Sequence, residues 1–345
     1  MRKGRATVLR LHLAVALLAG AALLLVSASG ALLIFRPELE DAVFGGPVRV
    51  QPGGSSAPLQ TLLEAGQARH PGLAPRALVL PEAAGRPARL LLAGPAGGAV
   101  DVLVDPVSAR VLGSRWLERS PLHALHALHT ELYLGARGRL VVAALGLLLV
   151  LQAATGLFLW WPFTRRLPRG FTIRHGRPWR VVGYDLHKVV GVVSLAFNVP
   201  VALTGTLLAL SAGAEPKLPS APPPADGRRA LRLDEIARRA EAIFPGGRVA
   251  SLRINRDGVE VRQRDGSVAR VDRQSGAATI VTDARRRGDR LWALMAPLHE
   301  GRFGGLASRW LYVAGGLTPA ALALTGFGVW LTRPRARPTA SSPSP

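Results

Sequence analysis

The sequence predicts an α-helical membrane protein: four transmembrane helices in two parallel pseudo-symmetric repeats, each carrying a small α+β domain outside the membrane. Three observations support this prediction: four long apolar runs, basic residues gathered in the short segments between them, and an internal duplication over most of the 345 residues. Each run is long enough, because a helix needs about 20 apolar residues to cross a ~30 Å hydrocarbon core.

The composition excludes several classes of protein. Lys and Arg total 44 against 22 Asp and Glu, so the formal net charge is +22, which by itself would suggest a nucleic-acid partner. The mean hydropathy is +0.22 and only 19% of residues are charged, which is too apolar for a soluble nucleic-acid-binding protein. There are no cysteines, which excludes disulfides, iron–sulfur clusters, zinc–thiolate sites and covalent c-type haem. Redox or metal chemistry therefore depends on the eight histidines, on carboxylates, or on a cofactor held by them.

The distribution of charge predicts the orientation. The apolar runs are Leu11–Phe35, Leu140–Trp161, Val189–Leu210 and Trp310–Leu331. The N-terminal residues, the loop Pro162–Arg180 with its six arginines and the tail Thr332–Pro345 with its three arginines contain no acidic residue, so we expect them in the cytoplasm. All the acidic residues except Asp185 fall in the two long segments, Arg36–Gly138 and Ser211–Ser308, which we expect on the other side.

The first apolar run has an alternative interpretation. Its basic start and the small residues Val26-Ser27-Ala28-Ser29-Gly30 resemble a signal peptide with a cleavage site. The duplication favours a retained helix, because this run matches the third one.

The duplication keeps polar residues in register. A shift of 175 residues (186 − 11) lays Leu11-His12 on Leu186-His187 and Ser29-Gly30 on Thr204-Gly205. A shift of 170 residues (298 − 128) lays Leu128-His129 on Leu298-His299 and Thr155-Gly156 on Thr325-Gly326. With two spans per copy, both copies have the same orientation, so a pseudo-two-fold axis along the membrane normal should relate them.

The two outer segments also correspond. We predict a helix at 59–71 and another at 231–245, followed by strands at 77–80, 88–92 and 100–104 and at 249–254, 258–264 and 268–271. Turns at Asp105–Ser108 and Asp272–Gly276 should close the two units, and the proline-rich segment Pro216–Asp226 should be a stiff linker. The expected order is: cytoplasmic N-terminus 1–10, first span 11–35, outer domain 36–122, elbow and second span 123–161, basic loop 162–180, third span 181–210, linker and outer domain 211–298, elbow and fourth span 299–331, and cytoplasmic tail 332–345.

Four histidines form two symmetric pairs. The axis would place His12 opposite His187 at the inner side and His129 opposite His299 at the outer side. Burying an ionisable residue near the membrane core costs free energy, so such residues are usually functional. A single histidine of this kind could equally be an interfacial residue that hydrogen-bonds to a neighbouring helix. Two facing imidazoles from different helices are what the axial ligation of a b-type haem requires, so we expect two non-covalent haem b groups. A simple metal site is the rival, and two imidazoles alone would leave the metal under-coordinated.

The surroundings of these histidines give further expectations. His129 and His299 precede their apolar runs by about ten residues, so Gly135 and Gly305 should break the helices and fold the rings back. His126 remains an alternative ligand to His129. Small residues at Ala16 and Gly191 would leave room for a macrocycle, and four arginines could pair with propionates: Arg10, Arg139, Arg302 and Arg309.

Three motifs carry a resemblance to a known family. They are Leu128-His129-Thr130-Glu131-Leu132-Tyr133-Leu134-Gly135, Asp185-Leu186-His187-Lys188-Val189-Val190-Gly191 and Leu298-His299-Glu300-Gly301-Arg302. Over almost its whole length the chain resembles the PepSY-associated transmembrane family, which includes iron-regulated membrane proteins of the siderophore-reductase kind. The resemblance implies a di-haem reductase of ferric chelates in the bacterial inner membrane, with PepSY-like domains in the periplasm.

No nicotinamide, flavin or nucleotide motif is present, so electrons would come from a separate cytoplasmic donor or a membrane quinol. The expected function is reduction of a ferric siderophore or another ferric chelate during iron uptake, with His12, His187, His129 and His299 as haem ligands. PepSY units also resemble peptidase propeptides, so one alternative is a non-redox membrane protein that binds or inhibits an envelope protein. A component of a transporter is another.

Overall fold

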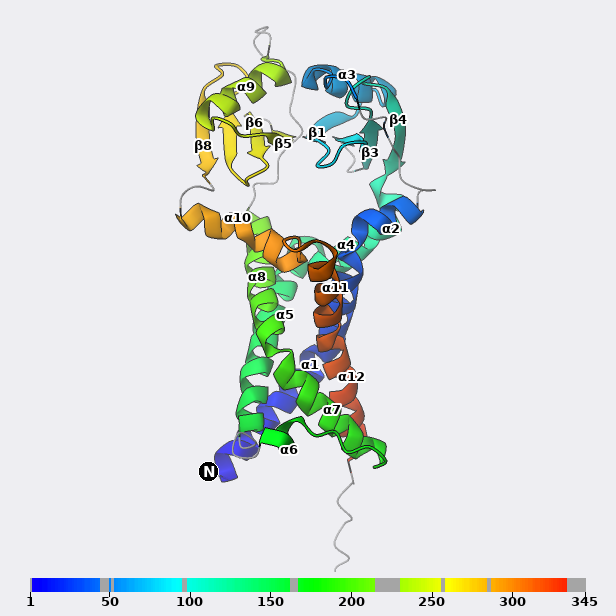
Figure 1. Ribbon diagram of the computed structural model, residues 1–345, viewed down its shortest axis with the longest axis vertical. Helices are drawn as coiled ribbons and strands as arrows, with labels where there is room; N and C mark the ends of the chain where they lie inside the picture. Colours follow the sequence, from blue (N-terminus) through cyan, green and yellow to red (C-terminus); the bar gives the residue numbers. More distant parts are fainter. Residues whose placement is uncertain are drawn as a thin grey trace, which may run out of the picture. The chain divides into compact units, whose positions relative to one another are not determined.

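The computed structural model describes residues 2–43, 50, 53–94, 98–161, 167–214, 230–255, 258–283 and 287–333. They form two compact units, which we treat separately (Figure 1). The membrane unit comprises residues 1–34, 127–213 and 299–345, and the sheet unit comprises residues 35–126 and 214–298. The expected linker Pro216–Asp226, the start of the basic loop and most of the C-terminal tail lie outside the described residues.

The membrane unit is a bundle of helices. Its elements are α1 (Arg2–Leu33), α5 (Gly135–Trp160), α6 (Leu167–Phe171), α7 (Trp179–Val193), α8 (Leu195–Ala214), α11 (Gly305–Gly316) and α12 (Thr318–Leu331), together with the ends of α4 (Pro121–Glu131) and α10 (Arg287–Glu300). Three stretches are long and apolar enough to cross a membrane: Lys3–Leu33, Gly135–Trp160 and Gly305–Leu331. The pair α7 and α8 makes a fourth if it is one bent span. The chain is therefore a multi-pass membrane protein with three to four candidate spans.

The outer surface of these helices is apolar. Leu18 is 80% exposed, and Leu140, Leu306 and Leu324 are each exposed by more than 60%. An apolar surface of this extent suits contact with lipid chains rather than with water. Within the bundle, α1 packs against α5 and α12, and α7 packs against α12 and α5.

Helices α7 and α8 meet at an angle of 64°, with Ser194 between them. Pro200 has no N–H to donate in the first turns of α8, which weakens the helix near the break. Polar side chains at the bend satisfy one another: Asn198 Nδ2 donates to Ser194 Oγ (3.0 Å), and the Thr318 hydroxyl lies 3.1 Å from Asn198 Oδ1. The apolar run Val189–Leu210 gave no sign of this bend, because its hydropathy continues across Ser194.

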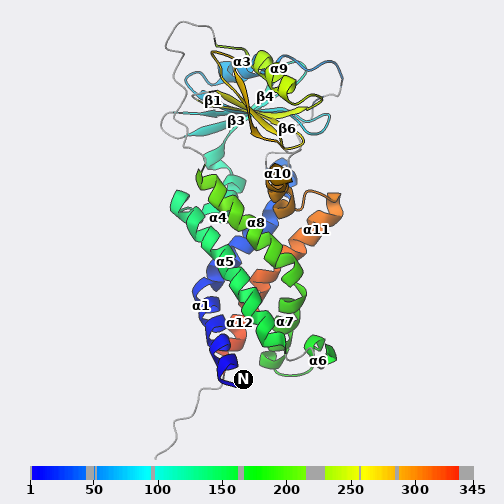
Figure 2. The same cartoon turned by 90° about the vertical axis from the view of Figure 1, so that its left-hand side faces the viewer.

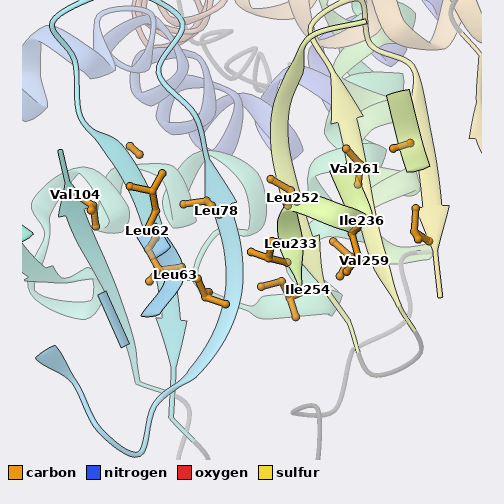
Figure 3. Close-up of a cluster of buried hydrophobic side chains, with 14 of the residues drawn as sticks. Leu62, Leu63, Leu78, Val104, Leu233, Ile236, Leu252, Ile254, Val259 and Val261 are labelled. Atoms are coloured by element: carbon orange, nitrogen blue, oxygen red, sulfur yellow. The ribbon is translucent and has the colours of Figure 1, made fainter. Parts of the chain in front are cut away.

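The sheet unit contains one antiparallel sheet in the order β4-β3-β2-β1-β5-β6-β7-β8. Its elements are α2 (Arg36–Val43), α3 (Leu59–Arg69), β1 (Ala74–Val79), β2 (Ala88–Ala93), β3 (Ala99–Val104), β4 (Val111–Trp116), η1 (Leu117–Arg119), α9 (Leu233–Ile243), β5 (Val249–Ile254), β6 (Val259–Gln263), β7 (Val268–Val271) and β8 (Ala278–Thr282). Helices α3 and α9 cover the same face of the sheet (Figure 2). The core lies between, with Leu62 and Ile236 from the helices against Leu78 and Leu252 from the central strands (Figure 3).

The predicted helices and the six predicted strands are present within a few residues of their expected ends. Two features differ from the prediction. The turns at Asp105 and Asp272 do not close their units but lead into the edge strands β4 and β8. The strands also form a single sheet, because β1 pairs with β5 through Leu78 and Leu252.

The N-termini of α3 and α9, the two helices that cover the sheet, are hydrogen-bonded to each other. Asp234 near the start of α9 accepts hydrogen bonds from the backbone N–H groups of Leu59 (2.7 Å) and Gln60 (3.3 Å) at the start of α3. In return, the Gln60 side-chain oxygen accepts from the Leu233 N–H (3.1 Å). Donors that a helix N-terminus leaves unpaired are thus satisfied from the neighbouring helix.

Candidate functional site

The inner histidine pair lies inside the membrane unit. His12 belongs to α1 and His187 belongs to α7, and each ring is partly buried. Their ring centres are 6.3 Å apart and their planes are almost perpendicular, at 88°. The structure therefore brings together the two residues that the duplication pairs.

The outer pair is formed by residues that lie just before sharp breaks in helix direction. His129 lies near the end of α4 and His299 near the end of α10, and their ring centres are 6.1 Å apart. After α4, Leu132, Tyr133 and Gly135 have positive φ angles of 49°, 59° and 58°. After α10, Gly305 has a φ of 61°. The predicted breaks before the second and fourth spans are confirmed.

Every one of the four rings is held through Nδ1. His12 Nδ1 lies 2.8 Å from Thr155 Oγ1, and His129 Nδ1 lies 2.8 Å from the Val26 carbonyl oxygen. The other two rings each have a carbonyl and a hydroxyl as partners. For His187 they are Leu322 O and Thr325 Oγ1, both at 3.1 Å, and for His299 they are Val201 O (3.1 Å) and Thr204 Oγ1 (3.2 Å).

These partners determine which ring nitrogen carries the proton. A carbonyl oxygen only accepts, so Nδ1 of His129, His187 and His299 must donate. The Thr155 hydroxyl donates its single proton in a hydrogen bond to the Leu151 carbonyl oxygen (2.8 Å). Thr155 Oγ1 can therefore only accept from His12, so Nδ1 of His12 must donate as well. In the neutral ring, Nε2 is then unprotonated and has a lone pair for a ligand. Within the described part of the chain, all hydrogen bonds of these rings involve Nδ1.

A glycine of a neighbouring helix lies close to each ring. A Cβ added at Gly30 would lie 2.6 Å from Cε1 of His129, and one at Gly205 would lie 2.7 Å from Cε1 of His299. The corresponding distances at the inner pair are 3.1 Å from Gly326 to His187 and 3.5 Å from Gly156 to His12. At the outer pair a side chain would collide with the ring, so the close approach requires glycine there.

The geometry fits a metal held between the two rings of each pair. Metal–imidazole bonds are about 2 Å long, so two imidazoles bound through Nε2 on opposite sides of one metal have ring centres about 6 Å apart. The separations of 6.3 and 6.1 Å agree with this value. Among the described residues no group of three or more His, Cys, Asp or Glu could hold a metal ion, so each pair offers two protein ligands.

The other predicted site residues have other contacts. The ring that faces His299 belongs to His129, while the alternative ligand His126 lies one turn earlier on α4. Arg139 pairs with Glu131 (3.0 Å), but its Nε is buried without a hydrogen-bond partner in the described structure, so it retains one unused donor. The Arg309 guanidinium donates to the Ile34 carbonyl (2.8 Å).

The other two predicted arginines and the two predicted small residues have no contact with the histidine rings among the described contacts. Arg302 pairs with Glu300 (2.5 Å), and Arg10 is exposed on α1. A Cβ on Gly191 would make only an ordinary contact of 3.7 Å with Leu322, and Ala16 is half-buried.

Two features of the site could not be assigned from the sequence. The Thr-Gly pairs recur visibly in the last three spans, but their role as acceptor and ring platform depends on the rotation of the helices about their axes. Asp185, the one acidic residue near the cytoplasmic side in the predicted topology, accepts from the Arg174 side chain (2.8 Å) and backbone N–H (3.1 Å) and lies 3.4 Å from Lys188 Nζ. It fixes the loop before α7 and lies two residues before His187.

Comparison with known proteins identifies the family to which the chain belongs. The family model described as "PepSY-associated TM region" matches residues 9–333. An uncharacterised protein of Pseudomonas aeruginosa is 28% identical over 260 residues, which cover 64% of this chain and 65% of the relative. The matched part thus spans slightly less than two thirds of that relative's length.

Proposed function

The chain belongs to the PepSY-associated transmembrane family, and from that premise we propose that it is a di-haem reductase of the bacterial inner membrane. It passes electrons across the membrane to a ferric chelate in the periplasm, as in iron uptake from siderophores. The observation that carries the proposal is the pair of facing imidazoles in each layer, with both Nδ1 atoms bonded and ring centres 6.3 and 6.1 Å apart.

Four residues would hold two haem b groups. His12 and His187 bind the inner one, and His129 and His299 bind the outer one. The haem iron would supply reversible one-electron transfer. Arg139, whose Nε retains a free donor in the described structure, is the best-supported partner for a propionate.

The protein's own groups prepare the site. The hydroxyl and carbonyl acceptors fix each ring's tautomer and orientation, so the metal meets a ring that already presents Nε2. The glycines let the rings lie close to the neighbouring helices. A preformed site binds without a large rearrangement.

The direction of electron flow follows from the proposed topology. The basic segments support a topology in which both termini and the loop 162–180 are cytoplasmic and the sheet unit is periplasmic, as a pair of PepSY-like domains. Electrons enter at the cytoplasmic side from a separate donor protein or from a membrane quinol. A ferric chelate is polar and bulky, so it takes them on the periplasmic side, near the outer pair.

The two-repeat organisation belongs to the same proposal. It is supported by the matched positions in the sequence and by the similar surroundings of the two pairs, because every ring lies close to a matched glycine of a neighbouring helix. A pseudo-two-fold axis along the membrane normal would generate both layers from one ancestral pair of helices.

The experiment uses purified full-length protein, reduced under anaerobic conditions and mixed with ferric siderophores in a stopped-flow spectrometer. We expect reoxidation within seconds. His299→Ala should abolish it while the inner haem remains reducible, and His175→Ala, which changes an exposed loop histidine, should leave it intact. Reoxidation by oxygen or quinone but by no ferric chelate would contradict the substrate class, and a protein without haem would contradict the whole proposal.

A further inference from the structure

Three hydrogen-bonded polar side chains lie inside the apolar helix bundle of the membrane unit, and we call them the junction. Ser194 and Asn198 are only 7% and 5% exposed, and Thr318 is half-buried. Asn198 Nδ2 donates to Ser194 Oγ (3.0 Å), and Asn198 Oδ1 accepts from the Thr318 hydroxyl (3.1 Å). Either orientation of the amide keeps these two partners, because both hydroxyls can donate and accept. Polar groups are costly to bury among membrane helices and are usually functional, so we looked for a role for the junction.

The junction connects two helix breaks. Ser194 separates α7 from α8, and Leu317 separates α11 from α12. Asn198 in the first turn of α8 bonds to the first residue of α12, so it links one break to the other. The ring of Phe197 lies against the backbone of Gly315 beside this link, because a Cβ added at Gly315 would lie 2.6 Å from the ring. Two neighbouring residues of α8 therefore hold the breaks together, and the close approach requires glycine.

The first half of the chain has no such cluster at the matched positions. Under the shifts of 175 and 170 residues that match the histidines (194 − 175, 198 − 175 and 318 − 170), apolar residues take the places of the junction: Ala19, Leu23 and Leu148. Helices α1 and α5 also run unbroken through these positions. The polar residues thus occur where the helices are interrupted and are replaced by apolar ones where the helices are continuous.

The junction lies close to parts of both histidine sites along the chain. On α7, His187 precedes it by seven residues (194 − 187). On α8, the Val201 carbonyl that binds His299 follows it by three residues (201 − 198). On α12, the Leu322 carbonyl that binds His187 follows it by four residues (322 − 318). Seven residues of helix span about 10 Å, so one ligand ring and acceptors of both sites lie within about 10 Å of the junction along their helices.

A break in a helix is a place where the two parts can rotate against each other. Pro200, which has no N–H to donate, weakens the start of α8 further. A rotation of ~10° at the break would move a side chain ~10 Å away by ~2 Å. Ligand sites have to be held to within roughly 0.5 Å and 10–20°. The two histidine sites therefore require that the breaks be fixed.

We propose that Asn198 is a positioning residue for both histidine sites. It fastens the α7–α8 break to the α11–α12 break, and thereby holds the His187 ring and the acceptors of His299 in place. The Ser194 and Thr318 hydroxyls fix the amide in turn. This assignment rests on the proposed function for the identity of the bound haems, and it adds what keeps the two sites in register.

The first test is the electron paramagnetic resonance spectrum of the full-length protein. The angle between the two imidazole planes of a haem determines its largest g value, and this angle is 88° for the inner pair and 40° for the outer pair. The two haems should therefore give separate signals. Asn198→Leu introduces the residue that the first half has at the matched position. It should shift and broaden both signals, because it releases parts of both sites.

Three further variants accompany this one. Thr318→Val should act in the same direction, and it keeps the test available if Asn198→Leu does not fold. Thr318→Ser keeps the hydroxyl and should give the wild-type spectrum. Ser211→Ala is the matched control, because the Ser211 hydroxyl of α8 donates to the Leu208 carbonyl of its own helix (2.9 Å), and it should change neither signal.

Two results would overturn the proposal. One is wild-type g values for both haems in Asn198→Leu and Thr318→Val, even if these variants melt at a lower temperature, because a cluster that only stabilises the fold would have that effect. The other is a shift of one signal alone, because the junction would then not serve both sites.

Amide hydrogen exchange tests the same proposal independently of haem. In the full-length protein, the segments around His187 and Val201 should exchange about 5-fold faster in Asn198→Leu than in the wild type, the equivalent of one lost hydrogen bond. Ser211→Ala should leave these rates unchanged. Equal rates in Asn198→Leu and the wild type would contradict the proposal.

The two proposals fail in different ways. If the purified protein contains no haem but Asn198→Leu speeds exchange in these segments, the proposed reductase function is wrong and the role of the junction in holding the histidine pairs stands. If ferric chelates reoxidise the reduced protein but Asn198→Leu changes neither the g values nor the exchange rates, the reductase function stands and the positioning role is wrong.

Discussion

At the scale of single residues, the hydrogen bonds to Nδ1 decide what the histidines can do. His12 has one acceptor, the Thr155 hydroxyl, whereas His187 has both a hydroxyl and the Leu322 carbonyl. An acceptor on Nδ1–H increases the electron donation of the ring to a bound metal. The two inner rings therefore depend to different degrees on their threonines.

This difference gives a prediction for the reduction potential. Thr155→Val keeps the shape of the side chain but removes the acceptor of His12, so the potential of the inner haem should rise by about 40 mV, the equivalent of one hydrogen bond of ~1 kcal/mol. Thr325→Val should have a smaller effect, because His187 keeps Leu322 O. Potentiometric titration measures both. Thr155→Ser should restore the potential, and equal shifts in both valine variants would show that the acceptors do not act in this way.

Two aspartates predict how stability depends on pH. Burial alone would raise the pKa of Asp105, but the N–H groups of Val107 and Ser108 outweigh it and hold the pKa below its ordinary value of 3.8. The Ser275 N–H and hydroxyl and the Gln274 N–H lower the pKa of Asp272 in the same way. Both carboxylates thus stabilise the folded state above pH ~4, and this contribution is lost as the pH falls through their lowered pKa values.

The measurement is thermal unfolding of the sheet unit within the full-length protein between pH 3 and pH 6, followed by tryptophan fluorescence. The wild type should lose stability below pH ~4, as the two carboxylates become protonated. An Asp105→Asn, Asp272→Asn variant should be less stable at pH 6 and should show a shallower decline. An unchanged pH profile in this variant would contradict the role of the two turns.

At the scale of elements, the predictable features were those with a strong local pattern. The apolar runs and the alternating strands β5 and β7 were predicted to within a few residues, because each buries a regular set of side chains. The strand β4, with sequence Val-Leu-Gly-Ser-Arg-Trp, and the edge strand β8 have no such alternation and were missed. The joining of the strands into one sheet was also missed, since the Leu78–Leu252 pairing links residues 174 positions apart.

In the candidate site, too, the features with a local sequence pattern could be predicted and the others could not. The positions of the four histidines in matched sequences allowed them to be paired before the structure was known, and their role as haem ligands stays a prediction. The bend at Ser194 and the choice of Thr155 rather than Gln152 as the ring's acceptor depend on how helices rotate against one another. No local pattern contains that information.

The reciprocal caps of α3 and α9 give a prediction at this scale. Asp234→Ala removes the acceptor of the Leu59 and Gln60 N–H groups, so the sheet unit should lose about 1–2 kcal/mol of stability. Glu241→Ala on the exposed side of α9 is the control and should be neutral. Both are measured by thermal unfolding of the full-length protein, and equal melting curves for the two variants would contradict the capping role.

At the scale of the whole molecule, the proposed function requires a defined orientation. Reporter fusions after Pro58 and Asp226 should behave as periplasmic, and a fusion after Arg333 should behave as cytoplasmic, because the basic segments lie between the outer ones. A cytoplasmic result at Pro58 or Asp226 would contradict the topology. A mature N-terminus near Ser29 would remove His12 and with it the inner pair.

The most direct test of the central claim is the haem content of the purified full-length protein, measured together with its low-temperature electron paramagnetic resonance spectrum. The account predicts two non-covalent haems per chain with the low-spin signals of two axial histidines each. His129→Ala or His299→Ala should leave one haem, His12→Ala or His187→Ala should leave the other, and His175→Ala should leave both. Purified protein that contains no haem, or loss of the outer haem in His126→Ala but not in His129→Ala, would contradict the account.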